Sequence, residues 1–482
     1  SWAAATPGVA LTGVVIERVA RAAASRLQRA EARRLARSVW SGMGESVALP
    51  VAATFEVAPT LEVGTGIARY AEAEIAAIRA LGAVDSVVRL APGPADPEIE
   101  HAAARGLFEL RMDDARAAIL ARRPSIRCAW ILHREGEELS LWDGAFPTLD
   151  TATATEAAAR GRARAHLKIV IERLTRKVGR VGEPPELPPP PRDDRAYARD
   201  RLRARLAQAW RRRVLKQGPR WSVAFQFADW EGIDLSRGAK IPNPPNHFLA
   251  DPFVTHEDGR AVCFVEDFDY ARGLGHIAAY ELTPGGARRL GEAIVEPFHM
   301  SFPFLLRHEG RLFMIPETWQ AGDIRLYECV GFPLRWEFRS TLMAGVSAAD
   351  TMVFPWGGRW AMATNIDLAG GPAGEHCSEL SLFFADSPMS DTWAPHAWNP
   401  VIVDPARARN GGLLTGADGA PHRVSQRQGF LTYGAGLSIN RIETLTDDAY
   451  AETPVRAVAS DFFPGLIGAH HLHSAGGVPV YD

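Results

Sequence analysis

The sequence predicts a multidomain protein with an amino-terminal α/β domain (residues 1–181) and a carboxy-terminal five-bladed β-propeller (residues 221–482). Between them we expect a Pro-rich linker followed by a basic amphipathic helix (residues 182–220). Three observations predict this organisation. Prolines cluster in one segment, helix-like and strand-like patterns alternate before it, and one hairpin pattern recurs five times after it. Recurrence of one unit at a regular period is typical of propellers.

Composition places the chain among soluble globular proteins. It has 482 residues, of which 46% are hydrophobic and 23% are charged, and its formal net charge is −3. This balance gives the whole molecule no electrostatic attraction for nucleic acid. No apolar run reaches the roughly 18 residues of a membrane span. The first residues also lack a basic leader, so we expect a cytoplasmic protein.

The four cysteines are far apart and form no CxxC pair: Cys128, Cys263, Cys329 and Cys377. Isolated cysteines in a long chain indicate buried thiols in a reducing compartment. Their spacing also argues against a zinc site.

In the amino-terminal domain the two kinds of pattern alternate. Ala- and Arg-rich sequence with helical spacing predicts helices over 14–40, 67–82 and 155–177. Apolar runs predict strands at 51–59 and 85–92, and a hairpin from 128–134 and 138–144. Such alternation indicates a layered α/β domain.

The segment that separates the domains, residues 182–194, is rich in proline, which favours an extended spacer. In the following residues 195–216, apolar side chains recur every fourth position among many arginines, at Leu202, Leu206, Trp210 and Val214. This pattern is typical of a helix on an anionic membrane surface, which would place the protein on the inner face of the membrane. A connector helix that docks its apolar face on a domain has the same pattern.

Each repeat of the second domain contains a short apolar strand, a turn with glycine and a second apolar strand. The turn glycines are Gly259, Gly310, Gly358, Gly419 and Gly477. Their period of roughly 50 to 60 residues suits a four-stranded blade. Residues 221–227 read as a strand that would complete the last blade and close the ring, which removes exposed sheet edges.

Polar residues recur at fixed distances from these glycines. Eight positions before two of them stand Asp251 and Asp350, and seven positions after the first four stand Glu266, Glu317, Asn365 and Gln426. One strand of a hairpin begins where the next ends, so we expect all six residues at one mouth of the central channel. Capping of turns is the alternative role for such residues. Pro252 should also hold Asp251 in an extended conformation.

Carboxylates crowded in a desolvated funnel suit sugar chemistry. Their repulsion drives their pKa values apart, and glycosidic chemistry needs one charged and one protonated carboxyl group. Arg409, Arg423, His471 and His473 should lie near the same mouth, where cations could bind the phosphates of a sugar nucleotide or phosphorylated lipid. Strand alternation separates His470 from the other two histidines, so we expect no metal site.

Residues 247–270, 301–318, 326–338 and 348–365 resemble the propeller domain of the glucosamine inositolphosphorylceramide transferase type. They are also similar to the furanosidase superfamily, whose first blade carries an Asp-Pro pair as at Asp251. This resemblance implies that Asp251 is the base or nucleophile and that Asp350 is the third-blade Asp. The general acid of the hydrolases has no direct counterpart, and Glu317 is the candidate for it.

Residues 102–114 and 129–151 resemble the formyltransferase-like region that precedes this propeller in bacterial relatives. The Asn/His/Asp signature of formyl transfer is absent from the sequence. The resemblance therefore implies a degenerate scaffold domain without catalysis.

The sequence thus favours a glycosyltransferase acting on a lipid-linked or surface-polysaccharide acceptor, with a sugar nucleotide as a candidate donor. Two alternatives stay open: a furanosidase-type glycoside hydrolase and a non-catalytic glycan-binding platform. The expected catalytic residues are Asp251, Asp350 and Glu317. The expected substrate-binding residues are Glu266, Asn365, Arg409, Arg423, Gln426, His471 and His473.

Overall fold

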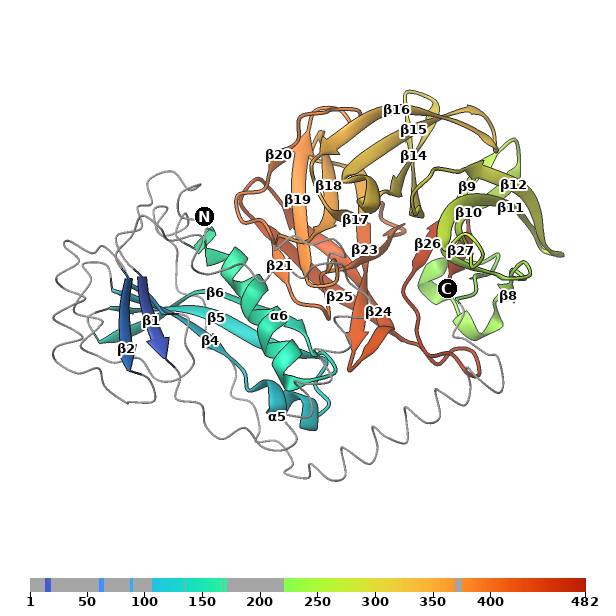
Figure 1. The fold of residues 1–482 in the computed structure, drawn as a ribbon. Helices are drawn as coiled ribbons and strands as arrows, with labels where there is room; N and C mark the ends of the chain where they lie inside the picture. Colours follow the sequence, from blue (N-terminus) through green and yellow to red (C-terminus); the bar gives the residue numbers. More distant parts are fainter. Residues whose placement is uncertain are drawn as a thin grey trace. The chain divides into compact units, whose positions relative to one another are not determined.

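The computed structural model describes residues 14–18, 60–64, 87–89, 106–134, 136–167, 169–170, 221–368 and 375–482. The chain divides into two compact units, one made mainly of residues 1–191 and the other mainly of residues 192–482. Each unit is described separately below (Figure 1). The predicted linker, the predicted basic helix over 195–216, and the elements expected at 51–59 and 67–82 lie outside the described residues.

The first unit combines strands and helices. A parallel pair is formed by β1 (Val14–Arg18) and β2 (Thr60–Gly64). A separate sheet has the order β3 (Val87–Arg89), β4 (Leu107–Met112), β5 (Ser125–Arg134) and β6 (Glu137–Pro147). The helices are α5 (Ala115–Leu120) and α6 (Ala152–Ala165). The buried indole of Trp130 in β5 donates to the Ala163 carbonyl at 2.7 Å, which packs α6 against this sheet.

Residues 14–18 are a strand, so the prediction that a helix begins there is wrong. Val14, Val15 and Ile16 are β-branched, and their restricted χ1 rotamers favour a strand over a helix. The strand expected within 85–92 is confirmed as β3, and the predicted hairpin is confirmed as β5 and β6, which are neighbours in the sheet. The helix expected from 155 begins slightly earlier, at Ala152, after Thr151 caps it.

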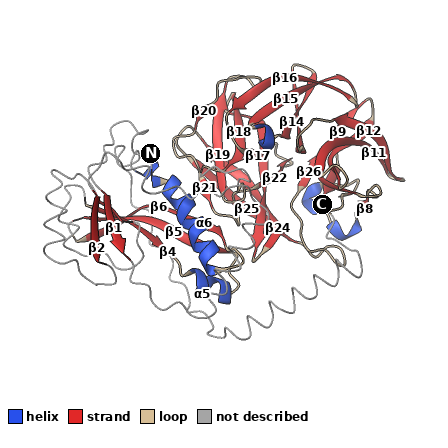
Figure 2. Cartoon of the chain, in the orientation of Figure 1, coloured by secondary structure: helices blue, strands red, loops and turns tan. Residues whose placement is uncertain are grey.

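The second unit consists of five antiparallel sheets (Figure 2). The first contains β9 (His247–Glu257), β10 (Arg260–Asp269), β11 (Leu274–Thr283) and β12 (Gly286–Ile294). The second contains β13 (Ser301–His308), β14 (Arg311–Glu317), β15 (Asp323–Gly331) and β16 (Arg335–Ala344). The third contains β17 (Ala348–Trp356), β18 (Arg359–Ile366) and β19 (Glu379–Ala385), with β20 (Ala394–Pro395) and β21 (Ile402–Val403) both paired to β19.

The fourth sheet contains β22 (Asn410–Thr415), β23 (Pro421–Gly429), β24 (Thr432–Leu445) and β25 (Tyr450–Ala459). The fifth joins the two ends of the unit, since β26 (Leu472–Ala475) and β27 (Val478–Tyr481) are continued by β7 (Ala224–Phe225) and β8 (Ala239–Lys240). Val480 pairs with Phe225 and Tyr481 with Ala224. The expectation that residues 221–227 complete the last sheet is therefore confirmed.

The first strands of the five sheets follow one another in a closed ring. Strand β9 contacts β13, β13 contacts β17, β17 contacts β22, β22 contacts β26, and β26 returns to β9. Aromatic side chains fill the space between neighbouring sheets, as where the ring of Phe253 lies 4.9 Å from that of Phe302. The five predicted turn glycines all sit in hairpin turns with φ between 73° and 81°. In this left-handed region a side chain is strained, which explains why glycine occupies each turn.

All four cysteines are free thiols in the structure; Cys128 and Cys263 are buried, whereas Cys329 and Cys377 are partly exposed. Among the described residues, no helix is both long enough and apolar enough to cross a membrane.

Candidate active site

A β-bulge interrupts the first strand of four of the sheets at the same position. In β9, β13, β17 and β22, two residues stand opposite one residue of the next strand: 251–252, 302–303, 350–351 and 411–412. The φ angles of Asp251 and Asp350 are 50° and 51°. Bulges re-aim the side chains of the bulged residues, and they are frequent at active sites. The bulges therefore orient both carboxylates.

The expectation that Pro252 holds Asp251 in an extended conformation is wrong. The φ angle of Asp251 is 50°, which lies in the left-handed region. Asp350 has nearly the same φ although Thr351 follows it. The conformation thus depends on the bulge and on the bonds around it. The proline preference acts only locally and is overridden by the tertiary structure.

The side chain of Asp251 is buried among hydrogen-bond donors. Its Oδ2 atom accepts from the backbone N–H of Phe302 at 3.3 Å, and its Oδ1 atom lies 3.3 Å from His470 Nε2. Burial raises the pKa of Asp251 to about 7, while the charge of His470 acts in the opposite direction. The Asp251 carboxyl group can therefore exchange a proton near neutral pH.

Asp350 is buried beside a cation. Arg409 donates from Nε to Oδ2 at 2.6 Å, and Gln426 donates from Nε2 to the same oxygen at 3.2 Å. Burial raises the pKa of Asp350 to about 7 even though Arg409 favours the charged form. The Arg409 guanidinium also lies over the ring of Tyr433, 5.4 Å from its centre.

Glu317 connects these groups. Its Oε2 atom accepts from the backbone N–H of Asp350 at 3.3 Å and lies 3.5 Å from Arg409 Nη2. Burial raises the pKa of Glu317, and Arg409 opposes this shift. Arg409 therefore bridges two of the three expected catalytic carboxylates.

Glu266 is a fourth buried carboxylate, and its Oε1 atom lies 3.6 Å from His299 Nε2. Burial raises the pKa of Glu266 well above its usual range, and the charges of Asp251 and Glu317 raise it further. Four acidic side chains from three sheets thus interact electrostatically, as the register of the repeats predicted. Burial and the neighbouring negative charges therefore both favour the protonated form of Glu266.

Two other expected site residues, Asn365 and Gln426, form hydrogen bonds within the framework. The amide of Asn365 donates to the carbonyls of Glu379 and Ala408 at 2.8 and 2.9 Å and accepts from the N–H of Asn410 at 2.9 Å. It therefore plays the capping role that we considered as the alternative. Gln426 donates to Asp350 and to the Asn410 carbonyl, while its Oε1 atom has no hydrogen-bond partner among the described residues.

Arg423 is also committed to the framework. It forms a two-point pair with Glu452, with N–O distances of 2.8 and 2.7 Å, and donates to the carbonyls of Arg407 and Ala408. Only 1% of this residue is exposed. The structure therefore places its charge against Glu452 rather than against the carboxylates of the site.

The two histidines that the sequence analysis selected have apolar surroundings. His473 Nδ1 bonds to the Leu413 carbonyl at 2.8 Å, and burial lowers the pKa of His473 to about 4. His471 is fully buried against the rings of Phe253 and Phe302, although its Nδ1 atom lies 3.8 Å from Asp251 Oδ1. Burial also lowers the pKa of His471, so the surroundings of both histidines favour the neutral ring.

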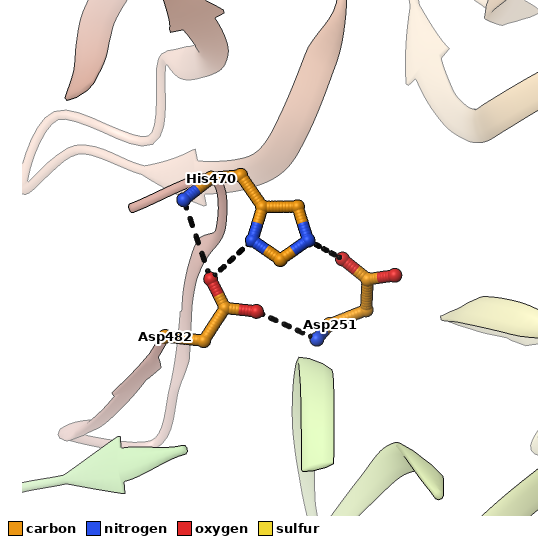
Figure 3. Close-up of side chains that lie close together, drawn as sticks. All are labelled: Asp251, His470 and Asp482. Atoms are coloured by element: carbon orange, nitrogen blue, oxygen red, sulfur yellow. Dashed lines mark hydrogen bonds and ion pairs between the residues drawn. The ribbon is translucent and has the colours of Figure 1, made fainter. Parts of the chain in front are cut away.

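His470 and Asp482 belong to the site, and the sequence analysis missed both. His470 Nδ1 lies 2.7 Å from Asp482 Oδ1, and the backbone N–H of Asp251 donates to Asp482 Oδ2 at 2.9 Å (Figure 3). Alternation was a poor guide because β26 begins only at Leu472, after both neighbouring histidines. Asp482 follows the last residue of β27, which pairs with β26.

The ligand atoms of Asp251, His470 and Asp482 all lie within 4.8 Å of one another, a spacing that a metal ion could use. In the structure, however, each ring nitrogen of His470 already faces a carboxylate. Burial disfavours the charged imidazole, but Asp482 and Asp251 outweigh it and raise the pKa of His470 to about 9. In this arrangement His470 therefore pairs with both carboxylates.

Residues 236–463 match a family model described as "Glucosamine inositolphosphorylceramide transferase 1, N-terminal". The second unit is thus similar to the amino-terminal region of these transferases. The Arabidopsis thaliana protein of that name is 33% identical over 215 residues, which are 44% of this chain and 28% of the relative. The protein of the same name from Oryza sativa subsp. japonica is 30% identical over 259 residues, 49% of this chain and 33% of the relative. The chain therefore spans a third or less of these relatives' length.

Solved structures with a similar course of the chain include glycoside hydrolases. Zg3597, a family 117 enzyme from Zobellia galactanivorans, has a TM-score of 0.35 and 11% identity over 54% of this chain and 90% of its own. The GH32 β-fructofuranosidase BmSUC1 of Bombyx mori has a TM-score of 0.37 and 11% identity over 60% of this chain and 62% of its own. TM-scores this low carry no argument about the fold. The arrangement of the five sheets described above rests on the strand pairing alone.

Proposed function

We propose that this chain is a carbohydrate-active enzyme, a glycosyltransferase that acts on a lipid-linked or surface-polysaccharide acceptor. The five sheets would be the blades of a propeller, and the buried carboxylates would line the mouth of its channel. One observation carries the proposal: Asp251 and Asp350 are buried in the same cluster, and each has a pKa raised to about 7. Groups of this kind can hold or release a proton near neutral pH.

Each carboxylate has a distinct partner, which supports separate roles. Asp251 faces His470 and would act as the base that accepts the proton of the attacking hydroxyl group. Asp350 is held by Arg409 and would orient the sugar or tune the charge of its neighbours. Glu317 has a raised pKa and would supply a proton, and Glu266 would bind a sugar hydroxyl in its protonated form.

The names of the relatives suggest the substrate class. If the second unit handles the same substrates, the acceptor is a lipid with an inositol phosphate headgroup and the sugar is a glucosamine. Arg409 is engaged by Asp350 and Glu317, so the phosphates of a sugar nucleotide would need other cations. Residues 195–216 would bring the protein to the cytoplasmic face of an anionic membrane, and the first unit would be a degenerate formyltransferase-like scaffold.

A furanosidase-type hydrolase is the second candidate. The observation in its favour is that the same cluster supplies both a carboxyl group beside a cation, Asp350, and one whose pKa is raised by burial and by neighbouring negative charges, Glu266. Hydrolysis of a glycoside needs one acid and one base or nucleophile. The two candidates differ in the group that attacks the sugar, a lipid or glycan hydroxyl in one case and water in the other.

The test is to incubate the full chain with a panel of sugar nucleotides and vesicles that contain inositolphosphorylceramide. Transfer predicts equal amounts of released nucleotide and glycosylated lipid, measured by mass spectrometry. A parallel assay with arabinofuranosides and fructofuranosides detects hydrolysis. Glycoside cleavage without a lipid product would establish the second candidate. If neither product forms but glycans bind tightly, the protein is a non-catalytic binding platform.

A further inference from the structure

Asp251, His470 and Asp482 lie in contact in the buried part of the second unit: His470 Nδ1 is hydrogen-bonded to Asp482, and His470 Nε2 lies 3.3 Å from Asp251 Oδ1 (Figure 3). At most 5% of each residue is exposed. Asp482 makes three contacts, since it accepts from the backbone N–H of Asp251 and from both the backbone N–H and Nδ1 of His470. The side chain of Asp482 thus fixes both the histidine and the backbone of the bulge.

We propose that His470 is a positioning residue: an imidazolium ion that donates to Asp482 through Nδ1 and faces the Asp251 carboxylate with Nε2, keeping Asp251 ionised and oriented. This inference rests on the proposed function at one point, because the proposed function gives Asp251 its catalytic role. A neutral ring would turn an unprotonated nitrogen toward one of the two carboxylates, so the two contacts together favour a proton on each nitrogen. The arrangement is therefore that of a cation between two anions.

The remaining contacts of His470 are consistent with a fixed cation. Its ring lies 4.1 Å from the ring of Trp221 and 5.6 Å from that of Tyr433, measured between centres. Aromatic faces favour a cation beside them. The stacking also restricts rotation of the imidazole, so the proton stays directed at Asp251.

Other charged groups also act on Asp251 and have to be considered. Asp350 and Asp482 raise its pKa, whereas Arg409 and His470 lower it. Asp251 in turn acts on Glu266 and Glu317. The nearby His471 favours its neutral form, because burial lowers its pKa. Of the two cations, His470 lies in direct contact with the Asp251 carboxylate, so removing it should disfavour the ionised form of Asp251 most strongly.

The protonation state of His470 can be observed directly. The full chain, labelled with ¹⁵N-histidine, contains 14 histidines, and the signal absent from His470→Gln assigns the ring of interest. We expect both ring nitrogens to be protonated at pH 7.5, with loss of the proton near pH 9. In Asp482→Asn the midpoint should fall by about one pH unit or more. A neutral His470 at pH 7.5 in the parent protein, or an unchanged midpoint in Asp482→Asn, would overturn the proposal.

The effect on Asp251 is measured from the pH dependence of the transfer or hydrolysis reaction. His470→Gln should shift the acidic limb of the kcat/KM profile to higher pH, because Asp251 loses its cation and becomes harder to ionise. The matched control is Asp267→Asn, which removes another buried Asp–His contact, with His247 at 2.6 Å, away from Asp251. An equal shift in both variants, or none in His470→Gln, would contradict a positioning role.

A metal ion is the competing explanation for the same residues. Dialysis against a chelator, followed by metal analysis and repetition of the ¹⁵N titration, tests it. The proposal expects no stoichiometric metal and an unchanged titration; one bound ion per chain, with a His470 signal that changes on its removal, would replace it. A charged His470 in a protein without transferase or hydrolase activity would refute the proposed function alone.

Discussion

Asp251 and Asp350 occupy the same position of a β-bulge in two different sheets, with φ angles of 50° and 51°. Phe302 has the same conformation in the intervening sheet but carries no charge. The bulge is thus a property of the repeat, and the carboxylates are specific to two of its copies. The same β-bulge therefore carries an acidic side chain, Asp251 or Asp350, at equivalent positions in the first and third sheets.

The bulge in β22 offers a test of how tightly the ring of sheets is closed. Gly412 has a φ of 124°, and a Cβ atom there would lie 2.2 Å from the Leu472 carbonyl oxygen. Gly412→Ala should therefore destabilise the second unit by at least about 2 kcal/mol, since backbone has to move. Thermal or urea unfolding measures the loss.

The control for that substitution is Gly419→Ala. Gly419 has a φ of 80° and no atom within 4 Å of an added Cβ, so only backbone strain of about 1 kcal/mol is expected. Equal losses in the two variants would mean that β22 and β26 are not closely packed.

Arg423 should matter for stability and not for ligand binding. Arg423→Leu leaves Glu452 buried without its partner, which typically costs about 3–5 kcal/mol. Urea denaturation measures this loss, and calorimetry measures glycan affinity. The control Arg441→Leu removes an exposed pair with Asp418 and should have little effect. A stable Arg423→Leu protein with weakened glycan binding would restore the substrate-binding role that the sequence suggested.

Stability should fall as the pH rises above 6.5. The pKa of His470 is about 9 in the folded protein, above its ordinary value of 6.5, so its contribution is complete below pH 6.5 and is lost as the pH rises through 9. The pKa of Asp251 is raised from 3.8 to about 7, so the contribution of its protonated form is lost between these pH values and is nearly gone where the loss from His470 begins. We expect Tm to decrease between pH 6.5 and 9, and to decrease less in His470→Gln. A constant or rising Tm of the parent protein would contradict this.

Residues 221–482 should fold without the first unit, because their five sheets close on themselves through β7 and β27. A fragment with these residues should give a far-UV circular dichroism spectrum dominated by strands and a single cooperative unfolding transition. A fragment that starts after β7, at residue 228, is the matched comparison and should be less stable. Equal stability of the two would mean that β7 does not secure the ring.

The sequence was informative where local chemistry determines structure. The glycine turns need a left-handed φ, and the register of the strands gives Asp251 and Asp350, and likewise Glu266 and Glu317, equivalent positions in their sheets, as the spacing predicted. It was uninformative where the tertiary structure decides. Counting residues along the strands could not reveal the bulges. A bulge adds one residue to a strand, and no particular residue type marks its position.

The site residues that were missed have a physical explanation of the same kind. His470 lies before β26, where side chains do not alternate as in a strand, and Asp482 reaches Asp251 through pairing between strands that are distant in sequence. Conversely, Asn365 was selected by its register in the repeat and Arg423 by its place beside the fourth hairpin, but their polar groups are used by backbone carbonyls and by Glu452. Position alone did not distinguish a binding residue from a framework residue.

The most direct test of the account is the substitution Asp251→Asn, which preserves shape and removes both charge and basicity. Turnover of the transfer or hydrolysis reaction should fall by about a hundredfold or more, while ligand affinity remains and Tm does not fall. Asp267→Asn, at a buried carboxylate that does not contact Asp251, serves as the control and should retain turnover. A variant of Asp251 with normal turnover, affinity and stability would contradict the assignment of the site to these carboxylates.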